Sequence, residues 1–331
     1  MLKILDLKTA ARQIKASCAA KRERNERAPF FFITGAGISA PSVPLAAAII
    51  QHCKTRALEL HGPSALPPAA DALTSYSHWL ALAYPNPDDR RIYLQGMIEG
   101  KAITSANLRL AHLLLTQTPS NLVLTVNFDD LLSRALLLFG KQHVLCDHPI
   151  TIGRIEAERD RDVQIVHVHG SYWFYDCCNL QHEVEGRAQS SAAPFSDMPT
   201  FLDHLLYNRS PLVLGYSGWE GDVVMSALKR RLYHNHQPNT LGYNVYWFVY
   251  DRGHIAALPE WLRAHPNVVF VAKPEPEPSA NSTTTTSGEN VTALRAASAR
   301  SIGLEKEQRA LFLPAHVALD ELIRVFELPT P

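Results

Sequence analysis

The sequence predicts an α/β fold in which a doubly wound parallel sheet carries an inserted helical subdomain. Short apolar runs with β-branched or aromatic residues recur at 30–34, 121–126, 163–168, 211–215, 244–250 and 267–272, which is typical of buried strands. Apolar residues at helical spacing fill much of the chain between these runs. Glycine and polar residues directly follow four of the runs, as at the ligand-binding edge of a parallel sheet.

Two stretches outside the expected strands have a helical pattern. Residues 1–28 are expected to form an N-terminal helix, because apolar residues recur at positions 7, 11, 14 and 18. Residues 45–118 are helical in pattern throughout, with prolines as punctuation. That is too much chain for one crossover between strands, so we expect an inserted helical subdomain there.

The end of the chain shows a different composition. Residues 274–308 include a low-complexity tract of Pro-Glu repeats followed by Ser and Thr, which cannot bury a core and is expected to be a surface insertion. Residues 311–314 are then expected to form a last strand, and residues 318–328 a last helix.

The segment after the first strand is the most informative of the chain. Residues 31–39 read Phe-Phe-Ile-Thr-Gly-Ala-Gly-Ile-Ser, and the turn is expected to open onto a helix through 46–50. Gly35 and Gly37 allow tight turning and close backbone approach, and Ser39 supplies a hydroxyl. Such a turn can present backbone N–H groups to a pyrophosphate. The third glycine of the dehydrogenase fingerprint is missing, which disfavours hydride transfer.

Three later strands also end in residues that can bind or react. The run at 121–126 leads into Asn127-Phe128-Asp129, the run at 163–168 into His169-Gly170-Ser171, and the run at 211–215 into Tyr-Ser-Gly-Trp-Glu-Gly-Asp. In a parallel sheet the carboxyl ends of the strands meet at one edge. We therefore expect these side chains to share a site.

Together these motifs resemble those of the sirtuins. Gly-Ala-Gly-Ile-Ser at 35–39 matches that family's first signature, Thr-Val-Asn-Phe-Asp at 125–129 resembles its Thr-Gln-Asn-Ile-Asp, and His169-Gly170 resembles its catalytic histidine motif. The resemblance covers the strand segments from about 29 to 272, with a return near 310. It implies a Rossmann-like NAD-binding domain formed by residues 29–44 and 119–331.

The sequence differs from the protein-deacylating sirtuins at several motifs. Protein-deacylating sirtuins hold a structural zinc with two Cys-x-x-Cys pairs, whereas the five cysteines here, at 18, 53, 146, 177 and 178, form no such pair. We therefore expect no metal. Where those sirtuins continue Ile-Pro-Asp-Phe-Arg, residues 43–47 read Val-Pro-Leu-Ala-Ala. The pattern Gly-Tyr-Ser-x-x-x-x-Asp at 215–222 is similar to sirtuin-like domains of bacterial antiphage systems such as Thoeris, which destroy NAD.

The resemblance implies NAD as the substrate and a role for each site residue. Asn127 is the catalytic residue that contacts the nicotinamide ribose and helps to position the attacking water, and His169 is the catalytic base. Asp129 is expected near the nicotinamide carboxamide. Asp251, after the run at 244–250, binds the adenosine ribose or starts a turn. The residues expected to hold the pyrophosphate are Gly35, Ala36, Gly37, Ser39, Gly215 and Ser217.

Several of these residues also have a structural interpretation. Asn127 could cap the helix that begins near Asp129, and Asp222 suits the cap of the following helix as well as it suits ligand contact. His169 could be a core histidine, but the Gly-Ser that follows it and the other motifs favour catalysis. His167, two positions earlier, is expected to be structural.

The expected function is NAD glycohydrolase activity, which cleaves NAD to nicotinamide and ADP-ribose, in an antiphage defence effector that depletes cellular NAD. A protein deacylase or ADP-ribosyltransferase of sirtuin type is the first alternative, and the missing cysteine pairs weaken deacylation. A nucleotide-sensing module without chemistry is the second. Asn127 and His169 argue against it, because a sensor needs the glycine segment but not the base.

The composition also bears on binding partners and location, and the expected activity implies that it must be controlled. Lys plus Arg and Asp plus Glu both total 32, so no net field favours nucleic acid. No run approaches the ~18 apolar residues of a membrane span, and the unpatterned cysteines with no export signal favour a cytoplasmic location. Because unrestrained loss of NAD would poison the cell, we expect an activating partner subunit, a homo-oligomer, or a longer parent polypeptide.

Overall fold

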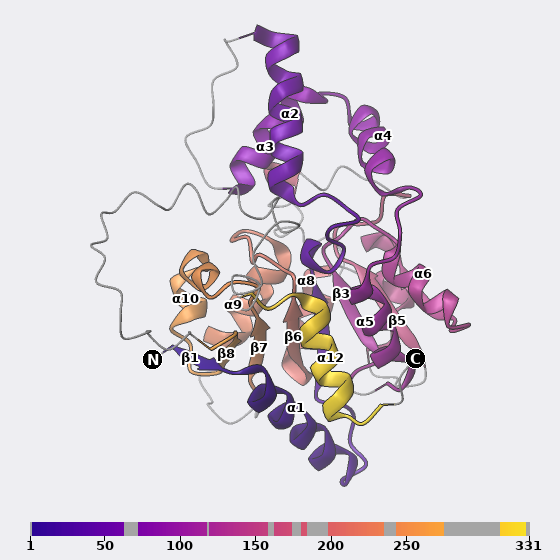
Figure 1. Ribbon diagram of the computed structural model, residues 1–331, viewed down its shortest axis with the longest axis vertical. Coiled ribbons are helices and arrows are strands. Elements are labelled where there is room, and N and C mark those ends of the chain that lie inside the picture. The colour runs from indigo at the N-terminus through magenta and orange to yellow at the C-terminus, as the bar shows by residue number, and fades with distance from the viewer. Residues whose placement is uncertain are drawn as a thin grey trace, which may run out of the picture.

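The computed structural model describes residues 2–62, 72–117, 119–157, 162–173, 180–183, 198–234, 243–274 and 312–328. Within these residues eight parallel strands form one sheet with helices on both faces (Figure 1). The strand order is β1-β8-β7-β6-β2-β3-β5-β4. This arrangement confirms the predicted α/β fold with a Rossmann-like, doubly wound parallel sheet.

The strands are short, and the six inner ones are buried along their whole length. Their bounds are β1 Lys3–Leu5, β2 Phe30–Thr34, β3 Leu122–Thr125, β4 His143–Cys146, β5 Val163–His167, β6 Ser210–Leu214, β7 Val245–Phe248 and β8 Val268–Val271. Burial on both faces explains why the inner strands read as continuous apolar runs. The edge strands β1 and β4 were not expected, because three and four residues are too few to give a clear strand pattern.

Two layers of helices cover the sheet. One face packs against α1 (Leu7–Arg22), α5 (Ser105–Leu115), α6 (Leu131–Leu138) and α12 (Ala315–Val325). The other packs against α8 (Met198–Asn208), α9 (Val223–His234) and α10 (Glu260–Arg263), with the short 3-10 helices η3 (Pro149–Arg154) and η4 (Arg252–Ala257). Each layer forms its own apolar core with the side chains of the sheet.

The remaining helices form a separate lobe. Helices α2 (Ala46–His61), α3 (Ala72–Ala83) and α4 (Pro87–Ile98) lie beyond the main body in Figure 1 and build a third apolar cluster around Trp79 and Leu80. Helix α5, expected in the same insertion, packs on the sheet instead. Contacts that join the lobe to other described segments include the rings of Tyr76 and Trp219, 5.8 Å apart, and the Arg90–Glu183 ion pair at 3.2 Å. Gln181 also bonds to Thr74 and to Ser77 of α3, both at 2.9 Å.

The last described segment differs from the expected strand. Residues 312–314 are not a strand, and the Leu313 N–H donates one hydrogen bond to the Tyr250 carbonyl at 2.7 Å. Helix α12 then returns the chain to the sheet beside α1 and α5. Residues 275–308 of the expected surface insertion lie outside the described residues. No described helix has the length and apolar character needed to cross a membrane.

The strand order sets the position of the site. Strand β2 lies between β3 and β6. The chain runs from β2 to β3, β4 and β5 on one side of β2, and then crosses back from β5 to β6 on its other side. The loops that follow β2 and β6 therefore face each other at the carboxyl edge of the sheet. In open α/β sheets this switch point is where ligands bind.

Candidate active site

Close backbone contact joins the loops after β2 and β6. Gly35 donates its N–H to the Leu214 carbonyl at 3.1 Å, and Gly37 donates to the Gly215 carbonyl at 2.9 Å. A Cβ at Gly35 would lie 2.7 Å from the Gly215 oxygen and from the Tyr216 Cα, so a side chain there must displace backbone. Gly35 itself has extended φ and ψ. Contact, and not backbone conformation, therefore requires glycine at this position.

The same loop commits its N–H groups within the protein. The Ser39 N–H donates to the Ala36 carbonyl at 3.1 Å, in addition to the Gly35 and Gly37 bonds. The turn forms only the three-residue 3-10 helix η1 (Ala36–Ile38), and α2 begins at Ala46, so the turn does not open directly onto a long helix as expected. Of the predicted pyrophosphate ligands, Ala36 and Ser217 are exposed, and Gly37 and Gly215 are half-buried.

Asn127, Ser39 and Asp129 form one hydrogen-bonded group at the ends of β2 and β3. The Asn127 amide donates to the Gly35 carbonyl and to the Ser39 hydroxyl, both at 3.2 Å. The Ser39 hydroxyl in turn bonds to the Asp129 carboxylate. Ser39 is only 1% exposed, so in this conformation it orders the two neighbouring side chains.

Asp129 also caps helix α6. Its Oδ1 accepts the Leu131 N–H at 3.2 Å, so the capping role that the sequence left open for Asn127 belongs to Asp129. Burial raises the pKa of Asp129 to about 6, against the opposing effect of the Ser39 hydroxyl and the Leu131 N–H. The carboxyl group therefore changes charge close to neutral pH.

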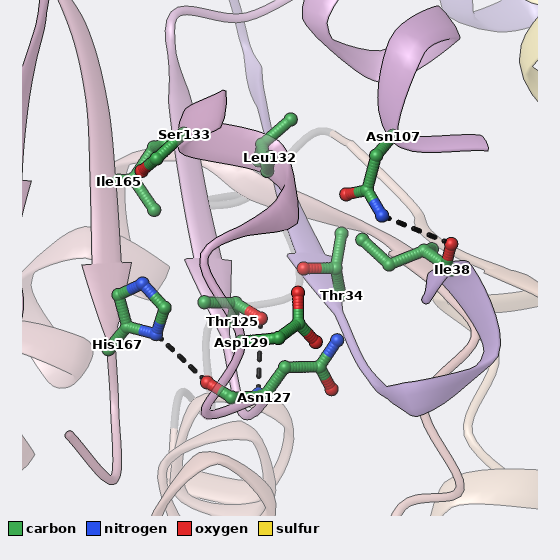
Figure 2. A pocket seen from close by; sticks show the side chains of 10 residues that line it. All are labelled: Thr34, Ile38, Asn107, Thr125, Asn127, Asp129, Leu132, Ser133, Ile165 and His167. Atoms are coloured by element: carbon green, nitrogen blue, oxygen red, sulfur yellow. Dashed lines mark hydrogen bonds between the residues drawn. The ribbon is translucent and has the colours of Figure 1, made fainter. Parts of the chain in front are cut away.

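His167 fixes the backbone of Asn127. Its Nδ1 donates to the Asn127 carbonyl at 2.9 Å, as Figure 2 shows. Burial lowers the pKa of His167, which keeps the ring neutral. The ring lines a small cavity that also contains Asn127 and Asp129 and leaves about 10 Å³ for the centre of a water molecule, the room of one water. The other lining residues are Thr34, Ile38, Asn107, Thr125, Leu132, Ser133 and Ile165.

His169 belongs to a second group, formed with Asp222 and Tyr216. His169 lies in the turn after β5, and its Nε2 is 3.0 Å from Oδ1 of Asp222. The Tyr216 hydroxyl donates to Oδ2 of the same carboxylate. The two histidines of this segment, His167 and His169, therefore have different partners.

Asp222 caps helix α9 and also contacts another residue of the candidate site. It precedes α9 and its Oδ1 accepts the Val224 N–H at 3.3 Å, as a cap does, while it also pairs with His169. Burial acts to raise the pKa of Asp222, but His169, Tyr216 and the Val224 N–H together lower it below its usual value. The carboxylate is therefore ionised at neutral pH. Sequence reasoning missed this pairing, for which the Gly-Tyr-Ser-x-x-x-x-Asp pattern was the available signal.

Gly35 connects the two groups. Its carbonyl accepts the Asn127 amide, and its Cα lies against the Tyr216 backbone. The structure thus places Asn127, Asp129 and Ser39 at the ends of β2 and β3, and the His169–Asp222 pair joins the loops that follow β5 and β6. Asp251 lies apart, in the loop after β7, where it accepts the Gly253 N–H at 2.9 Å and caps η4.

Possible metal ligands and a second hollow were also sought among the described residues. Among the described residues no three His, Cys, Asp or Glu side chains are grouped so that they could hold a metal ion. Cys177 and Cys178 lie outside the described part of the chain. A hollow of about 370 Å³ lies at the opposite, amino edge of the sheet, where Pro29 precedes β2 and Arg209 precedes β6.

Comparison with known families finds one matching domain model. Residues 121–269 match the family model of a SIR2-like domain. The match runs from β3 into β8 and contains Asn127, Asp129, His169 and Asp222, while the glycine segment at 35–39 precedes it. No curated protein matches the chain.

Proposed function

We propose that this chain, whose residues 121–269 form a Sir2-type domain with an NAD-related function, is an NAD glycohydrolase that releases nicotinamide and ADP-ribose. One observation carries the proposal. A buried amide lies at the glycine junction, and a buried histidine–carboxylate pair joins the loops after β5 and β6 at the same edge of the sheet. A dinucleotide bound at this edge is proposed to place its reactive ribose near both groups.

The amide of Asn127 suits the positioning of water. Its nitrogen is held by Gly35 and Ser39, and no described residue donates to its Oδ1. An amide oxygen in that situation accepts a hydrogen bond from a water molecule or a ribose hydroxyl. The bond from His167 to the Asn127 carbonyl keeps this side chain in place.

The reaction needs little beyond positioning and one base. The bond between the ribose and the nicotinamide nitrogen breaks, its electron pair stays with nicotinamide, and the cationic ring leaves as a neutral molecule. Water adds to the ribose carbon of the oxocarbenium-like intermediate and gives a proton to His169. The products are nicotinamide, ADP-ribose and one proton. The ionised Asp129 can accept the N–H groups of the carboxamide.

The remaining predicted ligands keep their roles in this proposal. Ala36, Gly37, Gly215 and Ser217 form the accessible surface of the junction and are proposed to contact the pyrophosphate. Since the Gly35 and Gly37 N–H groups are already bonded, side chains and remaining backbone groups must supply the contacts, or the loop must adjust on binding. Asp251 is proposed to contact the adenosine ribose.

We further propose that the activity serves antiphage defence by depleting cellular NAD under the control of a partner subunit or of self-association. The likeness of the 215–222 pattern to defence-associated domains supports this role. Sirtuin-type transfer to an acyl-lysine or another protein group is the alternative reaction.

The test is to incubate the purified chain with NAD and to measure nicotinamide and ADP-ribose by chromatography. Asn127→Ala and His169→Gln should each lower nicotinamide release by about two to four orders of magnitude. His112→Gln is the matched control, because His112 is buried in α5, outside the strand ends. Full activity in a folded Asn127 or His169 variant would exclude the assignment.

A further inference from the structure

We propose that Asp222 is a positioning residue, which holds His169 with a proton on Nε2 so that Nδ1 is the atom that takes the proton during the reaction. This inference rests on the proposed function. It assigns a role to Asp222 and selects between the two nitrogens of the catalytic ring.

The pair spans the part of the sheet that carries the rest of the site. His169 follows β5 and Asp222 follows β6, and in the sheet these strands are separated by β2 and β3. Their contact at 3.0 Å therefore bridges the carboxyl ends of β2 and β3, which lead to Ser39 and Asn127. A contact that only stabilised helix α9 would not need to reach across two strands.

The partners of the carboxylate determine the position of the proton. Oδ2 accepts the Tyr216 hydroxyl, and Oδ1 accepts the Val224 N–H. An ionised carboxylate has no proton to donate, so Nε2 of His169 must be the donor in the bond to Oδ1. In the neutral imidazole the lone pair then lies on Nδ1, and we assign this tautomer from the hydrogen-bond network.

Tyr216 holds the carboxylate in a fixed orientation. Burial and the neighbouring Asp222 charge raise the pKa of Tyr216 well above its usual value, so the phenol remains a donor. The ring stacks on Trp247, with centroids 5.8 Å apart. Oδ1 is thereby kept directed at His169.

The other nitrogen of His169 is free for the reaction. His169 is 6% exposed, and its buried Nδ1 has no hydrogen-bond partner among the described residues; the same is true of the Ser171 hydroxyl two positions later. A buried acceptor without a partner costs stability unless a bound molecule donates a hydrogen bond to it. Nδ1 takes the proton from water, and the Asp222 carboxylate stabilises the imidazolium that results.

Three variants separate positioning from helix capping. Asn caps a helix as well as Asp does, whereas Ala does not. Asp222→Asn should therefore melt like the wild type, yet lower kcat by about 10²- to 10⁴-fold with little change in KM. Asp222→Ala should lose both stability and activity. Asp6→Ala removes the equivalent cap of α1, where Asp6 accepts the Thr9 N–H at 3.0 Å, and should keep full kcat.

Nuclear magnetic resonance of ¹⁵N-histidine-labelled protein tests the tautomer without any need for NAD cleavage. The wild type should show His169, assigned with His169→Gln, protonated on Nε2 with slow solvent exchange, and Asp222→Ala should lose that protection. A neutral ring protonated on Nδ1, or an unprotected Nε2 proton, would overturn the inference. Where the wild type cleaves NAD, an Asp222→Asn variant with kcat within about threefold of it would also overturn it. A protected Nε2 proton in a chain that cleaves no NAD would instead overturn only the proposed function.

Discussion

At the scale of single residues, burial of the Asp129 carboxyl group disfavours its charged form. Its carboxyl group is buried beside Asn127, with the Ser39 hydroxyl and the Leu131 N–H as its partners. Burial raises its pKa to about 6, above the value of about 4 expected in the unfolded chain. Between these two values the native state binds a proton that the unfolded state has lost. Ionisation of Asp129 therefore lowers the free energy of unfolding as the pH rises from about 4 to about 6.

Asp129→Asn should relieve this cost. The amide keeps an acceptor for the Leu131 N–H and carries no charge, so at pH 7.5 the variant should be more stable than the wild type by up to about 3 kcal/mol. The difference should shrink as the pH falls through 6 and be smallest below 4. Denaturant unfolding at a series of pH values measures it. Asp162→Asn, at an exposed position, is the control, and a pH-independent difference for Asp129→Asn would contradict the account.

At the scale of elements, the junction between β2 and β6 is the feature that positions the site. The sequence predicted that the ends of β2, β3, β5 and β6 meet at one edge of the sheet, because glycines and polar residues follow these four runs. The reason for the glycines could not be predicted, since it depends on Gly215 packing against Gly35 and Gly37 from a distant strand. The His169–Asp222 contact was hidden for the same reason, because it requires the strand order. Strands β1 and β4 were not predicted because they are only three and four residues long.

Gly35→Ala tests the junction. The added Cβ would meet backbone atoms of Gly215 and Tyr216 at 2.7 Å, and overpacking of this kind typically costs about 1–3 kcal/mol. We expect a lower melting temperature and, because Gly35 joins Asn127 to Tyr216, a loss of NAD cleavage. Gly96→Ala is the control, since Gly96 lies in α4 and a Cβ added there would have no neighbouring atom within 4 Å. Equal melting temperatures for the two variants would exclude a tight junction.

At the scale of the whole molecule, the sheet and its two helical layers support the site, while the α2–α4 lobe stands beyond them (Figure 1). The Tyr76–Trp219 contact links this lobe to the loop after β6, which also carries Asp222. A partner or a second copy that bound the lobe, as proposed above, would therefore act on this loop through that contact. The fold could be predicted from apolar runs alone, whereas such control depends on surfaces that carry no motif.

Metal content is a second property of the whole molecule. The chain has no Cys-x-x-Cys pair, so the purified protein should contain no stoichiometric zinc, and a chelator should leave its melting temperature unchanged. Elemental analysis and thermal unfolding measure this. One zinc per chain would contradict the expectation and would restore the deacylase hypothesis, with Cys177, Cys178 and His182 as the ligands to replace first.

The most direct test of the central claim, that water is the acceptor, is nicotinamide release measured with and without an acetyl-lysine peptide. The purified chain is assayed both dilute and concentrated, so that self-association is sampled, with His169→Gln as the inactive control. The account predicts release of nicotinamide and ADP-ribose in equal amounts, at a rate that the peptide does not increase. Release that depends strictly on the peptide, with its acetyl group transferred to ADP-ribose, would contradict it.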